Sequence, residues 1–173
     1  HEESNQILNL RDFSNPILVL ENENNALFEN NSMSLSNSNV AMSFQPATTL
    51  NQAIINTQAF TVEAWIKPAN NTQNGPARII TLSNGTSDRN LTLAQDGDKY
   101  LLRTRTSNTT SNGMPNFDAP NGSVTAGQLQ HLVATRDAAG NEKMYINGEL
   151  VEEQLRFVGL SLHQVFLKQT FIL

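Results

Sequence analysis

A strict alternation of apolar and polar residues over positions 60–68 constrains this chain more than any other feature. Every second position is apolar: Phe60, Val62, Ala64 and Ile66. A period of two turns one set of side chains toward a core and the other set outward, which predicts a strand at 60–67. Pro68 lacks the N–H that a β-ladder needs and ends this strand. The predicted strand belongs to a β-sandwich, and its outer face carries Trp65, the single tryptophan of the chain.

The composition supports an all-β domain and excludes several classes of function. Most polar residues are uncharged, since charged residues make up only 16% of the chain, and such side chains suit exposed strand faces and turns. A net charge of −5 and a pI of about 5.1 argue against nucleic acid or an anionic membrane as partner, because phosphate binding needs clustered Lys and Arg. The absence of cysteine excludes disulfides, thiolate zinc sites and a cysteine nucleophile.

Short apolar runs separated by Asn, Gly, Pro and Ser predict many strands and almost no helix. The fold class expected is an antiparallel two-sheet sandwich of the jelly-roll type. We expect strands at 17–20, 32–36, 40–44, 60–67, 78–83, 90–95, 99–106, 130–136, 142–146 and 149–153.

Turn chemistry links several of these strands. The dipeptides Asp96-Gly97 and Asn147-Gly148 suit type I′ turns, in which φ is positive. Residues 130–153 are therefore expected to form a three-stranded antiparallel meander. The polar loop at 107–127 is long enough that we expect it to fold over the surface or to carry function.

The composition changes abruptly near the C-terminus, where Leu, Phe and Val dominate residues 155–173. Three interpretations are open: buried final strands, a membrane span that is short and interrupted by charge, or an end that is not the natural continuation. We place the sandwich in residues 1–154 and treat 155–173 as an atypical apolar tail. The chain begins with His1 and shows no signal peptide, so we interpret it as a segment of a longer protein.

Five segments together resemble a known family. Residues 60–68 (FTVEAWIKP) are similar to a strand with the pattern F-T-[VI]-E-A-W-[VI]-x-P, and 75–83 and 89–97 resemble the two strands that follow it. Residues 129–137 (LQHLVATRD) resemble W-x-H-[VL]-[AV]-x-T-R-D, and 143–148 (KMYING) resemble the hairpin after it. This order resembles bacterial laminin-G-like domains of the concanavalin A-like lectin and glucanase superfamily, with the best motif coverage over 60–151.

The resemblance implies a concanavalin A-like sandwich in an exported, multidomain bacterial protein, extracellular, cell-surface or periplasmic. Two departures from the family pattern stand out. Leu129 replaces the aromatic residue that usually precedes the family histidine, and nothing after Glu153 matches the closing strand of the family. An incomplete sandwich with an exposed edge is therefore one expectation for the C-terminal side.

No catalytic residue is expected. Glycosidases that this fold resembles carry paired acids in an E-x-D-x-E strand, one as nucleophile and one as acid, and this chain lacks that motif. Glu21 and Glu23 have a similar spacing, but they lie in an Asn-rich segment that we interpret as a loop. The three histidines have no metal-ligand spacing, and His131 is interpreted as a structural residue on a strand.

Three residues are candidates for ligand binding. Trp65 suits stacking on a sugar face, although packing is the favoured interpretation for a tryptophan in a sandwich. Arg103 and Arg105 share a strand face and suit sugar hydroxyls or sulfate esters, whereas the alternative is a solvated face paired with acids. No cofactor is required. Calcium is a candidate ion, with Asp96 and Asp98 as weak candidate ligands, because relatives hold it through Asp side chains.

The function expected is non-catalytic binding of a carbohydrate or another cell-surface ligand, alongside other domains of the same polypeptide. The alternative is a structural or protein-interaction module, for adhesion or spacing, without a glycan site. A glycosidase-related domain is a third hypothesis.

Overall fold

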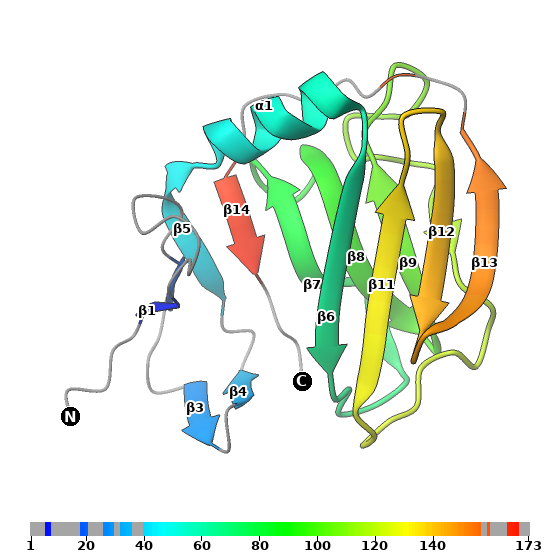
Figure 1. Cartoon of the computed structure of the whole chain (residues 1–173). Coiled ribbons are helices and arrows are strands. Elements are labelled where there is room, and N and C mark those ends of the chain that lie inside the picture. The colour runs from blue at the N-terminus through cyan, green and yellow to red at the C-terminus, as the bar shows by residue number, and fades with distance from the viewer. Residues whose placement is uncertain are drawn as a thin grey trace.

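The computed structural model describes residues 6–7, 18–20, 26–29, 32–35, 40–156, 159 and 166–169. Two antiparallel sheets face each other and form a sandwich (Figure 1). The larger sheet has the order β1-β2-β5-β14-β7-β8-β9-β10, and the smaller sheet has the order β13-β12-β11-β6. A separate hairpin joins β3 and β4. The prediction of an antiparallel two-sheet sandwich is confirmed.

The strands of the larger sheet are β1 Gln6–Ile7, β2 Leu18–Leu20, β5 Ala41–Pro46, β7 Gln73–Ser83, β8 Arg89–Gly97, β9 Lys99–Thr104, β10 Phe117–Asp118 and β14 Phe166–Gln169. Those of the smaller sheet are β6 Phe60–Ile66, β11 Gln130–Arg136, β12 Asn141–Ile146 and β13 Glu149–Leu155. The hairpin is β3 Ala26–Glu29 with β4 Ser32–Leu35, and the helix is α1 Thr48–Thr57.

The core lies between the two sheets and draws large side chains from both. Leu93, Tyr100 and Leu102 from the larger sheet are fully buried, as are Leu132 and Met144 from the smaller sheet. The strands of the smaller sheet obey the expected alternation, since every second residue of β11 and β12 is buried. In β8 and β9 of the larger sheet, side chains on both faces are buried. Burial of such side chains stabilises a fold by roughly 1.5–3 kcal/mol each, which makes this shared core the main reason that the two sheets stay together.

The meander predicted for 130–153 is confirmed by the pairing of β11 with β12 and of β12 with β13. Its second turn has positive φ at both central residues, Asn147 and Gly148, as a type I′ turn requires. The turn between β8 and β9 differs from the prediction. Asp96 pairs with Lys99, so the central residues are Gly97 and Asp98, and only Gly97 has positive φ. That combination matches a type II′ turn rather than type I′.

Helix α1 was not predicted. It starts after Ala47, which offers no side-chain cap, and it ends at Gln58 in the left-handed region, where glycine is usual. It packs across one end of the sandwich and buries Ile54 in the core (Figure 1). The helix therefore lacks the local start and stop signals that would mark it in the sequence, and tertiary packing stabilises it.

Other strand boundaries also depart from the predictions. β7 begins at Gln73 rather than at 78, and β9 ends at Thr104 rather than at 106. The loop predicted at 107–127 contains the short strand β10.

In the tail, β14 lies between β5 and β7, while 157–158, 160–165 and 170–173 lie outside the described residues. Glu21, Glu23, His1 and His163 lie outside them as well. In the described part of the chain, the single helix is too short to cross a membrane.

Candidate ligand-binding face

The outer surface of the smaller sheet presents an exposed aromatic pair. Trp65 on β6 lies directly opposite His131 on β11. Their rings are stacked, with centroids 4.4 Å apart and an angle of 10° between the planes. The indole remains 65% exposed. One side of the Trp65 ring thus rests on imidazole, and much of the remainder is free for contact with a ligand. The interpretation favoured from the sequence, that Trp65 packs in the sandwich, is wrong.

His131 is held in place by contacts on both sides. Its backbone N–H donates to Asn147 Oδ1 at 2.8 Å, and its carbonyl accepts the N–H of Asn147 at 2.8 Å. Its Nε2 lies 3.5 Å from Glu63 Oε2, on the strand that carries Trp65. The type I′ turn at Asn147 therefore holds the backbone of β11 at His131, the residue on which the Trp65 ring stacks. The imidazole Nε2 itself has no hydrogen-bond partner, so the structural role predicted for the His131 side chain stays a prediction.

Apolar side chains continue from this pair across the sheet. Val133 lies two residues beyond His131 on the same face and pairs with Tyr145, which in turn pairs with Leu150. We call Trp65, His131, Val133, Tyr145 and Leu150 the aromatic face. It crosses β6, β11, β12 and β13, which lie side by side in Figure 1. Such a flat, partly apolar surface suits the apolar face of a sugar ring.

A polar hollow adjoins the aromatic face at the β12–β13 turn. It has a volume of about 450 Å³ and is lined by Pro120, Asn121, Gly122, Ser123, Ile146, Asn147, Glu149 and Val151. Gln130 fixes one wall, because its Nε2 donates to the Ser123 carbonyl at 2.9 Å and its Oε1 accepts the N–H of Thr125 at 2.9 Å. Asn147 belongs to both places, since it lines the hollow and bonds to His131. Amide, hydroxyl and carboxylate groups beside an aromatic platform are the usual partners of sugar hydroxyls.

The two predicted arginines lie elsewhere. Arg103 belongs to β9 in the opposite sheet, is nearly buried, and donates from Nε to Asn116 Oδ1 at 2.8 Å. Burial lowers the pKa of its guanidinium, and the charges of Asp96 and Asp118 act in the opposite direction. Arg105 follows β9 and forms an ion pair with Asp88. The structure therefore does not bring Trp65 together with Arg103 and Arg105.

The aspartates proposed for calcium serve as turn and loop acceptors. Asp96 Oδ1 accepts the N–H of Gly75, and Asp98 Oδ2 accepts the N–H of Gly122, each at 2.9 Å. Among the residues that the structure describes, no three acidic or histidine side chains form a group that could hold a metal ion. Calcium binding stays a prediction.

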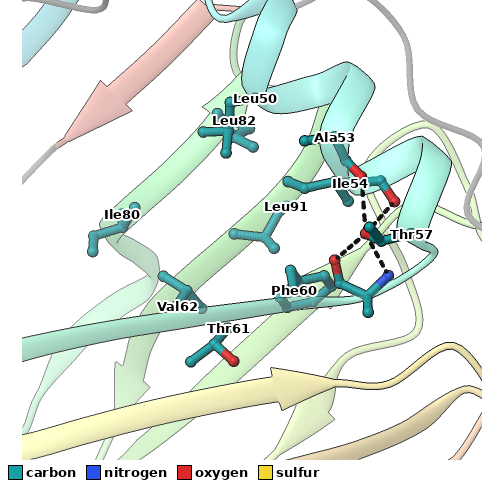
Figure 2. A pocket seen from close by; sticks show the side chains of 11 residues that line it. Leu50, Ala53, Ile54, Thr57, Phe60, Thr61, Val62, Ile80, Leu82 and Leu91 are labelled. Atoms are coloured by element: carbon teal, nitrogen blue, oxygen red, sulfur yellow. Dashed lines mark hydrogen bonds between the residues drawn. The ribbon is translucent and has the colours of Figure 1, made fainter. Parts of the chain in front are cut away.

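A second hollow lies beneath helix α1 and is apolar. Its volume is about 310 Å³, and Figure 2 shows side chains from α1, β6, β7 and β8 turned toward it. The lining residues are Leu50, Ala53, Ile54, Thr57, Ala59, Phe60, Thr61, Val62, Ile80, Leu82 and Leu91. Thr57 already donates its hydroxyl to the Ala53 carbonyl at 2.8 Å. This hollow offers few groups to orient a polar ligand, so the aromatic face is the better candidate for a sugar.

Comparison with protein families identifies the fold. The model of the concanavalin A-like lectin/glucanases superfamily matches residues 42–163, most of the chain. The chain belongs to this superfamily. The match extends beyond residue 154, where we placed the domain boundary, into the apolar tail. No curated protein sequence matches the chain.

Solved structures with the same fold include binding domains of bacterial toxins. The botulinum neurotoxin serotype G binding domain has a TM-score of 0.59 at 15% identity, covering 92% of this chain and 40% of that one. The serotype D binding domain has a TM-score of 0.56 at 17% identity, covering 96% and 43%. A structure of botulinum neurotoxin type C has a TM-score of 0.52 at 13% identity, covering 95% of this chain and 36% of that one. The cell entry of that toxin is described as dependent on interaction with two ganglioside molecules. This chain spans about two fifths of these structures, and the likeness shows the concanavalin A-like fold.

Sequence reasoning found Trp65 but missed its neighbours on this concanavalin A-like sandwich. The register of β11 against β6 and β12 places His131 and Tyr145 beside Trp65, and period-two patterns do not fix which residues face each other across strands. The alternation of apolar and polar positions could have identified them, because it places His131, Val133 and Tyr145 on the outward side of the predicted meander. Leu129, where the family has an aromatic, is 62% exposed at the edge of this surface.

Proposed function

We propose that this chain is a non-catalytic binding module that holds a carbohydrate on the aromatic face. The observation that carries this proposal is the exposed indole of Trp65, held flat against His131. A pyranose ring would stack on the indole through its C–H face, and its hydroxyls would reach the polar hollow beside Asn147. Membership of a superfamily of lectins and glucanases supports a carbohydrate ligand, and the ganglioside dependence described for a toxin with the same fold agrees with it.

We further infer that the module acts without hydrolysing its ligand, as part of an exported, multidomain bacterial protein at the cell surface. The missing paired-acid motif supports the first part, and the superfamily supports the second. Incubation with β-glucans and analysis of the products would test hydrolysis. Release of reducing sugar that is lost in a Glu21→Gln, Glu23→Gln variant would establish the glycosidase hypothesis instead.

The single tryptophan provides a direct test of sugar binding, because all tryptophan fluorescence of the chain arises from Trp65. We expect a ligand found on a glycan array to change the intensity or wavelength of this emission in a saturable way. Trp65→Ala should abolish binding on the array, and Trp65→Phe should retain part of it. Leu155→Ala is a matched control, because Leu155 is exposed on β13 outside the aromatic face. Absence of binding to any glycan, or binding that Trp65→Ala leaves intact, would contradict the proposal.

A protein partner is the second candidate, and the exposed leucines favour it. Leu129 and Leu150 are 62% and 47% exposed on or beside the aromatic face. An exposed apolar patch, here leucines that adjoin an exposed tryptophan, marks protein interaction sites on many surfaces. A pull-down from cell-surface extracts with the wild type and with Leu150→Ser would decide between the two. Capture of a defined protein that depends on Leu150, in the absence of glycan binding, would favour an adhesion or spacer role.

A further inference from the structure

The outer face of the larger sheet holds a cluster of arginines on three adjacent strands. Arg78 on β7 pairs with Ala94, and Arg103 on β9 pairs with Thr92. Ala94 and Thr92 alternate with the core residues Leu91 and Leu93, so this pair of arginines lies on the side away from the core. Arg89 begins β8 and pairs with Ser83, which lies two residues beyond Thr81, the partner of Thr92, so Arg89 belongs to the same side of the sheet. We call Arg78, Arg89 and Arg103 the arginine cluster.

Arg89 is the unusual member, because it is buried with much of its hydrogen-bonding capacity unused. Its side chain is 5% exposed, and only Nη2 has a partner, the Thr86 carbonyl at 2.7 Å. Its Nε and Nη1 are buried without an acceptor. Among the residues that the structure describes, no carboxylate forms an ion pair with Arg89 or with Arg78.

Burying Arg89 without an acceptor lowers the stability of the fold unless a bound group compensates for it. A buried cation without a counter-charge loses its hydration and destabilises the fold. Burial, with smaller contributions from the charges of Arg78 and Arg103, lowers the pKa of Arg89 to about 10, so it stays charged at neutral pH. Other arginines of the chain have carboxylate partners. The buried Arg136 lies 3.1 Å from Glu142, and Arg105 is paired with Asp88.

The loop after β9 forms one wall of the arginine cluster. The Ser111 carbonyl accepts the N–H of Arg89 at 2.9 Å, and Asn116 holds Arg103. Gly113, with a φ of 73°, lies so close that an added Cβ would come within 3.0 Å of the Arg103 Cβ. Arg78 is only partly buried, so the cluster reaches solvent at its β7 side. Two buried arginines and a partly exposed third one therefore lie on one face of the sheet.

We propose that the arginine cluster is a binding site for a compact anionic group, a sulfate, a phosphate or a carboxylate, centred on Arg89. Such a group would accept from the unpaired N–H bonds of Arg89 and offset the charges of Arg89 and Arg78, whereas Asp96 and Asp118 already act on the charge of Arg103. Arginine suits this purpose because its planar, permanently charged guanidinium matches the oxygens of these anions. The site lies on the sheet opposite the aromatic face, so it goes beyond the proposed function and does not rest on sugar binding.

The test uses the side-chain Nε–H resonances of ¹⁵N-labelled protein at neutral pH. Sodium sulfate, sodium phosphate and sodium acetate are each titrated at constant ionic strength, with sodium chloride as the balancing salt. We expect the Arg89 Nε–H resonance to shift in a saturable way with at least one of the three. Sulfate, phosphate or acetate as the tightest ligand would assign the anionic group to that class. Absence of a saturable Arg89 shift with all three anions would overturn the proposal.

Variants separate a binding role of Arg89 from a structural one. Arg89→Met should remove the saturable shifts of the remaining cluster, and Arg89→Lys should retain a weakened response. In chloride alone, Arg89→Met should raise the melting temperature by about 2–4 °C, because it removes a buried unpaired charge. Lys143→Met is the matched control, since it changes the net charge equally on the other sheet and should leave anion binding unchanged. Saturable shifts of Arg78 or Arg103 that persist in Arg89→Met would contradict a site centred on Arg89.

Discussion

At the scale of single residues, Glu142 is a buried carboxylate that the side chains of two arginines and a glutamine contact. It is fully buried on β12, where Arg136 Nη1 lies at 3.1 Å, Arg156 Nε at 3.3 Å and Gln154 Nε2 at 2.6 Å. We expect Glu142→Ala to lower the free energy of unfolding by about 3–5 kcal/mol, because Arg136 and Arg156 would both lose their buried carboxylate partner. Urea unfolding measures this loss. Glu153→Ala is the control, since Glu153 is exposed and its pair with Lys143 is worth about 0–1 kcal/mol. Equal losses in the two variants would contradict the assignment.

Tyr100 provides a residue-scale prediction about pH. Its side chain is fully buried and its hydroxyl donates to Gln130 Oε1 at 2.7 Å. Burial raises the pKa of this phenol above its usual value of 10. Above about pH 10 the unfolded chain therefore loses a proton that the folded chain retains, so the free energy of unfolding falls as the pH rises. The stabilisation is fully present below pH 10.

The measurement is the pH dependence of urea unfolding between about pH 9 and 11. We expect Tyr100→Phe to show a shallower decline than the wild type, by up to about 1.4 kcal/mol per pH unit. Tyr145→Phe is the control, because Tyr145 is partly exposed on the aromatic face. The prediction fails when both variants decline as steeply as the wild type.

At the scale of elements, local signals could be predicted and contacts distant in sequence could not. Period two located β6 and β11, and Asn147-Gly148 located a hairpin, because both patterns act within a few residues. Helix α1 was not predicted because its ends carry neither a polar cap nor a glycine. The burial of Arg103 depends on a loop that returns over β9, which no pattern within the strand reveals. The exposed stacking of Trp65 depends on the register of β6 against β11.

The β12–β13 hairpin yields the element-scale prediction. Asn147 has a φ of 53° and its Oδ1 accepts the N–H of His131. We expect Asn147→Val to lower the free energy of unfolding by about 2–3 kcal/mol, because a β-branched residue is strained at positive φ and the hydrogen bond is lost. Asn147→Gly should cost less, since it loses only the hydrogen bond. Asn121→Val, in an exposed turn where φ is not positive, is the matched control. Urea unfolding measures all three, and a similar cost for Val and Gly at position 147 would contradict the argument.

At the scale of the whole molecule, the integrity of the larger sheet depends on its last strand. β14 pairs with β5 on one side and with β7 on the other. It is therefore the link between β1-β2-β5 and the strands that form the core with the smaller sheet. Strands β5 and β7 both lie far from β14 in the sequence, so local sequence patterns could not predict this strand order.

Truncation tests this link. A variant that ends at Arg156 lacks β14, whereas a variant that ends at Gln169 keeps it and serves as the control. We expect the shorter variant to expose both the β5 and the β7 edges, since each loses its ladder of hydrogen bonds. Limited proteolysis followed by mass spectrometry should then show rapid cleavage within β5, Ala41–Pro46, in the shorter variant, and slow cleavage there in the control. The smaller sheet and β7–β9 share the central core, so they should resist cleavage in both variants. Equal protection of β5 in the two variants would mean that β1-β2-β5 is held by contacts other than β14.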